Sequence, residues 1–85
     1  MNYNLVYTPR AEKDINKLDP FIKNRIGKSL LKLLNNPIGY SEKLTDPRIG
    51  TYRYRIGDYR VIFDVAGKDI VILRIGHRKE IYKRL

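Results

Sequence analysis

The sequence predicts an α+β fold in a single domain over residues 1–85, with the element order β-α-α-β-β-β and a short C-terminal helix. Residues 51–65 alternate apolar and polar side chains, which is the period of a strand with one buried face. Two earlier segments carry apolar residues at helical spacing, and each opens on a capping residue followed by proline. A mainly antiparallel sheet packed on a helical hairpin would bury both kinds of apolar face.

The amino-terminal part is expected to form one strand and two helices. Residues 3–7 are rich in aromatic and β-branched side chains, which favour a strand. Thr8 and the proline after it provide the start of a helix over residues 9–18. Asp19 and its following proline repeat that signal, so a second helix runs over residues 20–35 and forms a hairpin with the first.

Two further segments lack a strong repeating pattern. Residues 37–50 contain several glycine and proline signals and no sustained period, so they predict a long ordered loop. Near the end of the chain, Ile81 and Leu85 are four residues apart, which predicts a short helix over residues 79–85.

The first predicted hairpin brings like charges together. Residues 57–58, Gly-Asp, form a two-residue turn, so Arg55 lies directly opposite Arg60 on the polar face. Like charges in such a pair cost roughly 0.2–1 kcal/mol, and an anion bound between the two side chains would remove that cost. The pair therefore favours an anion-binding face.

The second predicted hairpin adds the last strand. If residues 67–69 form a three-residue loop, Arg74 joins the other arginines and its neighbours join the apolar face. Shortening that loop by one residue would bury Arg74, so the hydrophobic pattern selects this register. The residues expected on the apolar face are Val71, Leu73 and Ile75.

Composition and charge indicate a polyanionic partner. Eighteen lysines and arginines against nine acidic residues give a net charge of +9, which favours nucleic acid as the partner. The absence of cysteine excludes disulfides and thiolate metal sites and agrees with a reducing cytoplasm. No metal-ligand spacing or glycine-rich phosphate loop occurs, so any catalysis is expected to need no metal or cofactor. With no signal peptide or membrane-spanning run recognisable, we expect a cytoplasmic protein.

Arginines gather on the polar face of the predicted sheet and just beyond its last strand. An antiparallel sheet often leaves one face in water, so scattered arginines would indicate only a solvated face. Arginines on neighbouring strands instead favour a phosphate site, because the guanidinium fork binds phosphate oxygens in pairs and keeps its charge. The residues concerned are Arg53, Arg55, Arg60, Arg74 and Arg78.

Two nearby residues are candidates for proton transfer. His77 is the only histidine and follows a glycine at the end of the last strand, and a neutral imidazole can accept a proton. Tyr82 lies four residues after Arg78, on the same face of the expected helix, where it can stack on a base or supply a hydroxyl. Simple packing is the alternative role for Tyr82.

Residues 52–63 and 75–82 resemble the RelE/ParE superfamily of prokaryotic toxin–antitoxin toxins, and the order of elements extends the resemblance over nearly the whole chain. The segments read Tyr-Arg-Tyr-Arg-Ile-Gly-Asp-Tyr-Arg-Val-Ile-Phe and Ile-Gly-His-Arg-Lys-Glu-Ile-Tyr. In the RelE branch, the resemblance implies an endoribonuclease that cuts messenger RNA in the ribosomal A site and is silenced by an acidic antitoxin. The ParE branch shares the fold and poisons DNA gyrase. The residues that match the family's basic and aromatic positions are Arg53, Arg55, Arg60, Arg78 and Tyr82.

Two functions therefore remain open from the sequence, and the presence of Arg60, Arg78 and Tyr82 favours the first. In the first, the chain is a metal-independent RNase in which Arg60 and Arg78 stabilise charge on the phosphorane while Arg53 and Arg55 position the backbone. In the second, the chain inhibits DNA gyrase without catalysis, and the arginines contact the target or the antitoxin. A plain RNA-binding module is a weaker third option, because the tyrosines within residues 52–59 are expected in the core. In the RNase, the proton-transfer candidates are His77 and Tyr82.

Overall fold

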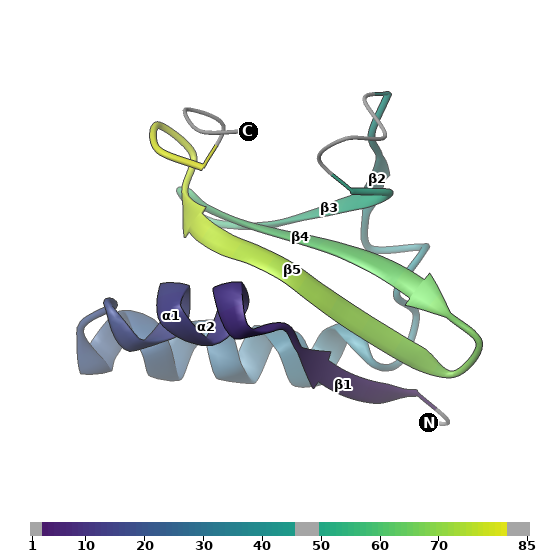
Figure 1. Ribbon diagram of the computed structural model, residues 1–85, viewed down its shortest axis with the longest axis horizontal. Coiled ribbons are helices and arrows are strands. Elements are labelled where there is room, and N and C mark those ends of the chain that lie inside the picture. The colour runs from purple at the N-terminus through teal and green to yellow at the C-terminus, as the bar shows by residue number, and fades with distance from the viewer. Residues whose placement is uncertain (1–2, 46–49, 82–85) are drawn as a thin grey trace.

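The computed structural model describes residues 3–45 and 50–81 and has two layers, a five-stranded sheet with both helices on one of its faces (Figure 1). The strand order is β1-β5-β4-β3-β2, and all pairs are antiparallel except β1 with β5. The α+β prediction is confirmed, with β2 as an additional short strand inside the expected loop. The elements are β1 (Asn4–Tyr7), α1 (Pro9–Asn16), α2 (Pro20–Leu33), β2 (Glu42–Lys43), β3 (Tyr52–Ile56), β4 (Tyr59–Ala66) and β5 (Asp69–His77).

Both helices begin where the cap-plus-proline signals predict. The side chains of Thr8 and Asp19 accept hydrogen bonds at 3.1 and 3.0 Å from the backbone N–H three residues further on. Each bond satisfies one of the amides that a first helical turn leaves without a partner. α1 ends at Asn16 and α2 at Leu33, about half a turn earlier than the sequence suggests.

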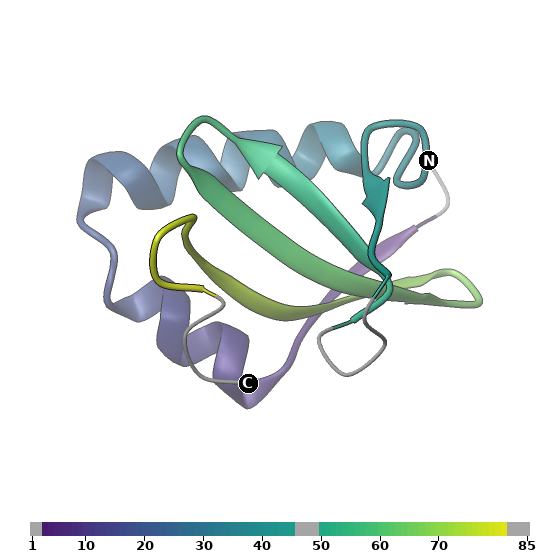
Figure 2. The ribbon, with the colours of Figure 1, turned by 90° about the horizontal axis from the view of Figure 1, so that it is seen from above.

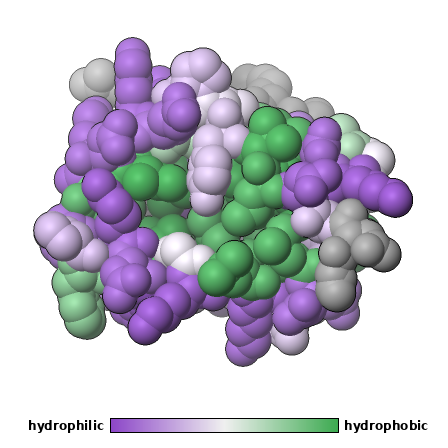
Figure 3. Space-filling view, turned by 90° about the horizontal axis from the view of Figure 1, so that it is seen from below, coloured by the Kyte–Doolittle hydropathy of each residue, from purple (hydrophilic) through white to green (hydrophobic). Residues whose placement is uncertain are grey.

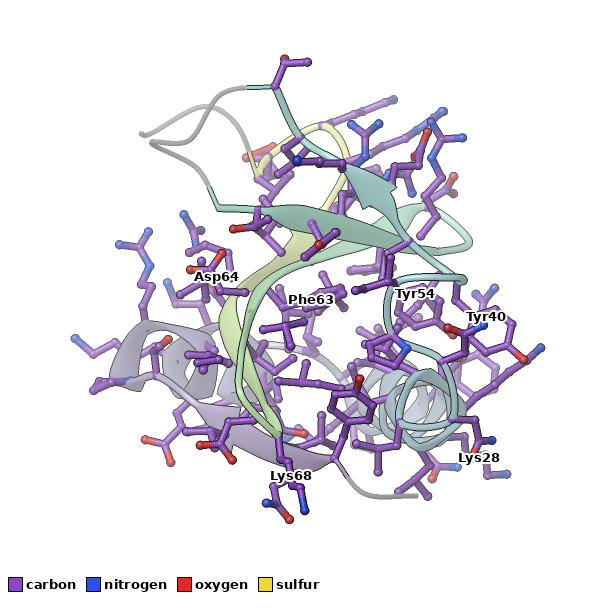
Figure 4. All side chains as sticks on the ribbon, turned by 90° about the vertical axis from the view of Figure 1, so that its right-hand side faces the viewer. Lys28, Tyr40, Tyr54, Phe63, Asp64 and Lys68 are labelled. Atoms are coloured by element: carbon purple, nitrogen blue, oxygen red, sulfur yellow. The ribbon has the colours of Figure 1, made fainter. Side chains whose placement is uncertain are left out.

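The core lies between the helices and the sheet, and Phe63 of β4 sits in it, fully buried (Figure 4). Tyr54 of β3 reaches across the core, where its hydroxyl donates a hydrogen bond of 3.1 Å to the Ser29 carbonyl of α2. Burial raises the pKa of the Tyr54 phenol above its ordinary value of 10.0, which keeps the proton that this bond uses. The other large core residues include Ile26, Leu30, Leu33, Val61, Ile70, Ile72 and Ile75.

The β4–β5 hairpin differs from the prediction in the length of its loop and in the register of half of its strand pairing. The turn contains two residues, 67–68, instead of three. This shorter turn would carry Arg74 to the core face, but a β-bulge at Leu73 shifts the strand by one residue and pairs Arg74 with Ile62 on the opposite face. The predicted register is therefore correct for the part of β5 that follows the bulge and wrong for the part that precedes it. The core-facing residues of β5 are Ile70, Ile72 and Ile75, whereas Val71 and Leu73 do not face the core.

The sheet face away from the helices is partly covered. Ile62 points to that face and is nevertheless completely buried. Gly50 lies against it with φ of +152°, and a Cβ at this position would come within 2.6 Å of Ile62 and 2.9 Å of Leu73. The Asp64 carboxylate fixes the same segment by accepting the Thr51 N–H at 2.8 Å. The part of this face nearest the β3–β4 turn, where Arg55 and Arg60 lie, is outside this covered region.

Asp14 of α1 closes the edge of β5 beyond the end of β1. Its Oδ2 accepts the Ile75 N–H at 2.9 Å and the Arg74 Nε–H at 2.8 Å, and the side chain is only 8% exposed. The carboxylate thus satisfies a strand-edge amide and a mostly buried cation together. No helix among the described residues is long and apolar enough to cross a membrane.

Asp14→Ala is expected to lower the free energy of unfolding by roughly 3 kcal/mol, because it removes the acceptor of a buried amide and the partner of a mostly buried cation. Urea unfolding followed by circular dichroism measures the loss. The control is Glu12→Ala on the same helix, since Glu12 is exposed and should cost less than about 1 kcal/mol. Equal losses in the two variants would contradict the role given to Asp14.

Candidate functional site

The β3–β4 hairpin confirms the predicted opposition of two arginines. Arg55 pairs with Arg60 across the two strands, and alternation places both side chains on the sheet face away from the helices. Arg53 lies two residues before Arg55, so it shares that face. Figure 2, which looks onto this side, shows β3 and β4 crossing the middle of the sheet between β2 and the C-terminal turn.

Glu42 of β2 links the two arginines of β3. Its Oε1 lies 3.1 Å from Arg53 Nη2 and 3.0 Å from Arg55 Nε. Half of the Glu42 side chain is exposed, as is 58% of the Arg55 side chain, so this carboxylate sits at the accessible end of the group. Glu42 could not be predicted from the sequence, because it lies in a segment without periodicity. A strand so short leaves no pattern, and only the pairing with β3 brings Glu42 into the site.

Arg60 and Arg78 belong to different segments of the chain, and both contact the turn between β3 and β4. Arg60 Nη1 donates to the backbone carbonyls of Gly57 and Tyr59 at 2.8 and 2.9 Å, which bends the guanidinium toward the turn. Arg78 follows β5, and its N–H donates to the Asp58 carbonyl at 2.8 Å. Its Nε lies 3.7 Å from the Asp58 carboxylate, and 55% of the side chain is exposed.

We call Arg53, Arg55, Arg60 and Arg78, together with Glu42, the arginine face. Three separate segments supply these side chains: β2, the β3–β4 hairpin and the residue after β5. Arg55 and Arg78 are the exposed members of this group. Guanidinium groups at such a convergence can bind the oxygens of one phosphate from different directions, while the carboxylate can accept a proton. No group of three possible metal-ligating residues occurs within residues 3–45 and 50–81.

Arg74 and His77 lie apart from the arginine face. Arg74 bends to the sheet edge, where Asp14 binds it. His77 pairs with Tyr59 on the helical side, with ring centroids 5.4 Å apart and an edge-to-face angle of 78°. The signal for this orientation was in the sequence, since His77 follows the core residue Ile75 by two positions in one strand.

His77 lines a cavity of about 330 Å³ at the end of β5, together with Tyr59, Leu18 and Glu80. Its Nδ1 accepts the Lys79 N–H at 3.1 Å, which leaves Nε2 as the nitrogen that can exchange a proton. The expected C-terminal helix begins instead with a turn over residues 78–81, and Tyr82 lies outside the described residues.

Comparison with known proteins identifies the family of this chain. The family model described as ParE toxin of type II toxin-antitoxin system, parDE, matches residues 5–82. Toxin RelG of Mycobacterium tuberculosis is 31% identical over 87 residues, which cover 99% of this chain and 100% of RelG.

Solved structures agree with that assignment. The toxin–antitoxin complex RelBE2 of M. tuberculosis contains a chain that is 28% identical, with a TM-score of 0.83 over 92% of this chain and 100% of that one. The isolated E. coli RelE toxin is 26% identical, with a TM-score of 0.73 over 94% of this chain and 90% of that one. The chain belongs to the RelE/ParE superfamily of toxins from type II toxin–antitoxin systems.

Proposed function

We propose that this toxin is a metal-independent endoribonuclease that cleaves messenger RNA on the ribosome and so inhibits translation in the cytoplasm. The observation that carries the proposal is the arginine face, where Arg55, Arg60 and Arg78 converge on one end of the sheet. A site of this kind can neutralise the charge that develops on a phosphate under attack. The RelE-like fold supports the same assignment.

The chemistry follows from which side chains can move protons. The ribose 2′-OH attacks the adjacent phosphorus, the bond to the 5′-oxygen breaks, and the products are a 2′,3′-cyclic phosphate and a 5′-OH. Guanidinium groups keep their protons at neutral pH, so the arginines stabilise charge and do not act as bases. In our proposal Glu42 accepts the 2′-OH proton, and His77 or Tyr82 supplies a proton to the 5′-oxygen.

We propose that three arginines contact the RNA backbone to different extents, according to their exposure: Arg53, Arg55 and Arg74. Arg55 is the most exposed of the three, while Arg53 is about one quarter exposed and Arg74 is held by Asp14. We therefore propose that Arg55 makes the primary phosphate contacts. Arg74 would make only a peripheral contact, because its ion pair with Asp14 restricts its side chain.

The second part of the proposal is a cognate antitoxin that silences the toxin. Relatives of this chain were solved as RelBE2 and RelBE toxin–antitoxin complexes. The net charge of +9 favours an acidic partner. Figure 3 shows the helical side of the molecule, where an apolar area is surrounded by hydrophilic side chains. An exposed apolar area with a polar rim is typical of a surface that a protein partner covers.

Primer extension on a translated messenger tests this proposal. Purified toxin should produce new 5′ ends only when ribosomes are present, and cleavage should continue in EDTA because the proposed chemistry uses no metal. Addition of the protein encoded by the neighbouring reading frame should abolish cleavage. Intact messenger under all these conditions would contradict the proposal.

The alternative function is inhibition of DNA gyrase without catalysis. The family model that matches residues 5–82 is that of the ParE toxin, which is the observation that favours this reading. In that case the arginine face would contact a protein instead of RNA. A gyrase supercoiling assay, run beside primer extension with the same preparation, separates the two functions, since loss of supercoiling with intact messenger would select the alternative.

A further inference from the structure

Arg25 of α2 reaches the turn between β3 and β4, although helix and turn belong to different layers of the molecule. A Cβ placed on Gly57 would come within 2.5 Å of Arg25 Nη2 and within 3.1 Å of both Cζ and Nη1. The guanidinium group therefore occupies the space that a side chain at position 57 would fill. Figure 2, which looks down onto the sheet, shows this turn over α2. Arg25 thus packs against the turn from the helical side.

The conformation of the turn makes room for this contact. Gly57 has φ of +59°, and no described residue other than glycine has a positive φ, so Asp58 does not share this conformation. A positive φ at only the first of two central residues is the pattern of a type II′ turn, which favours glycine at that position. The same glycine leaves the turn without a Cβ on the side where the Arg25 guanidinium lies.

Two further arginines bind carbonyl groups of the same turn. Arg60 Nη1 donates to the Gly57 carbonyl at 2.8 Å, and the Arg78 N–H donates to the Asp58 carbonyl at 2.8 Å. The Arg60 side chain starts from the sheet face away from the helices, so Gly57 has one guanidinium group on each side. A shift of Gly57 would therefore move the acceptor that holds the Arg60 side chain.

An ion pair does not account for the position of Arg25. Its side chain is exposed and forms no ion pair with any residue in the described ranges. The carboxylate of the turn, on Asp58, lies 3.7 Å from Arg78 Nε and so already has a cation beside it. Arg25 and Arg60 approach one glycine as like charges, which repel each other. A phosphate bound nearby would reduce that repulsion.

We propose that Arg25 is a positioning residue for messenger cleavage. It holds Gly57 in place and, through the Gly57 carbonyl, holds the Arg60 guanidinium where a phosphate can meet it. The reaction in this proposal rests on the proposed function, whereas the effect of Arg25 on the Arg60 side chain does not depend on cleavage. Arg25 acts from the helical side and needs no contact with the phosphate.

The first test observes Arg60 without ribosomes, by ¹⁵N relaxation of its Nε–H group in the purified chain. Arg25→Ala should lower the order parameter of this group, because the turn that holds the guanidinium loses its packing partner. Lys28→Ala is the matched control, since it removes one exposed cation from the same helix and should leave the order parameter unchanged. Urea unfolding checks that both variants remain folded.

The second test measures single-turnover cleavage on programmed ribosomes over a range of toxin concentrations. Arg25→Ala should lower the maximal rate by about 10- to 100-fold, since a misplacement of about 1 Å can cost about 10²-fold. The toxin concentration that gives half of the maximal rate should stay within about twofold of wild type, and Lys28→Ala should keep the maximal rate within the same factor. Arg25→Lys should lose rate as well, because lysine keeps the charge and lacks the planar group.

A double-mutant cycle decides whether Arg25 acts through Arg60. In the Arg60→Ala background, Arg25→Ala should cause no further loss of rate, because the side chain that it positions is already absent. Losses that multiply in the double variant would overturn the proposal. So would an effect of Arg25→Ala confined to the half-maximal concentration, which would make Arg25 a separate binding contact.

Two other results would also overturn the proposal: an unchanged order parameter for Arg60 in Arg25→Ala, and a full cleavage rate in Arg25→Lys beside a reduced rate in Arg25→Ala. The second would assign the effect to charge alone. A lower order parameter for Arg60 in a chain that cleaves no messenger would support the positioning of Arg60 by Arg25 while the proposed function fails.

Discussion

Arg60→Ala is expected to lower the rate of messenger cleavage about 10²–10³-fold without changing the fold, the loss typical of removing one donor to a developing oxyanion. The Arg60 guanidinium bonds only to carbonyls of its own turn among the described contacts, so its removal leaves no buried charge behind. Arg78→Ala should cost a similar factor, because Arg78 reaches the same end of the sheet from the residue after β5.

Single-turnover primer extension on programmed ribosomes measures both rates, and urea unfolding checks the fold. Lys68→Ala is the control, because it removes one exposed cation distant from the arginine face and should leave the rate within about twofold. Arg60→Lys keeps the charge and loses the planar fork, so an intermediate rate is expected. Rates near wild type in both alanine variants would remove the basis for catalysis at this face.

The sequence predicts the parts of this fold that local rules control. Thr8 and Asp19 begin helices as capping residues do, and the glycine at position 57, with φ of +59°, makes the turn that sets Arg55 opposite Arg60. These features depend on a few neighbouring residues, so they can be derived without the rest of the chain.

The features that the sequence did not predict depend on contacts between distant segments. A bulge at Leu73 shifts the strand by one residue and so offsets the shorter, two-residue turn. The alternating pattern of the sequence is compatible with either a longer loop or a bulge, so it cannot distinguish them. Glu42 enters the site through pairing of a two-residue strand, which has no sequence signature of its own. Asp14 reads as a solvent-facing helix residue until the edge of β5 is placed beside it.

Those distant contacts also change the assignment of proton transfer. His77 faces Tyr59 on the helical side, whereas Glu42 lies directly between Arg53 and Arg55. A base must be within hydrogen-bond reach of the proton that it removes. A phosphate bound at the arginine face would therefore bring its ribose closer to Glu42 than to His77, which lies on the other face of the sheet.

Glu42→Gln is accordingly expected to lower the single-turnover cleavage rate about 10²–10⁴-fold, the usual effect of losing a general base. Glutamine keeps an oxygen that can accept hydrogen bonds from Arg53 and Arg55 but cannot take up the 2′-OH proton. RNA affinity should consequently change little, while the limb of the pH–rate profile that rises with pH should disappear. A purely structural role for Glu42 would leave the shape of that profile unchanged.

His77→Gln and Tyr82→Phe provide the comparison, because both residues are candidates to protonate the leaving 5′-oxygen. Loss of that acid should flatten the limb that falls with pH, and the variant with the larger rate loss identifies the donor. If His77→Gln instead removes the rising limb and Glu42→Gln does not, the base is His77, and the RNA must then reach around the end of β5 into the cavity that His77 lines.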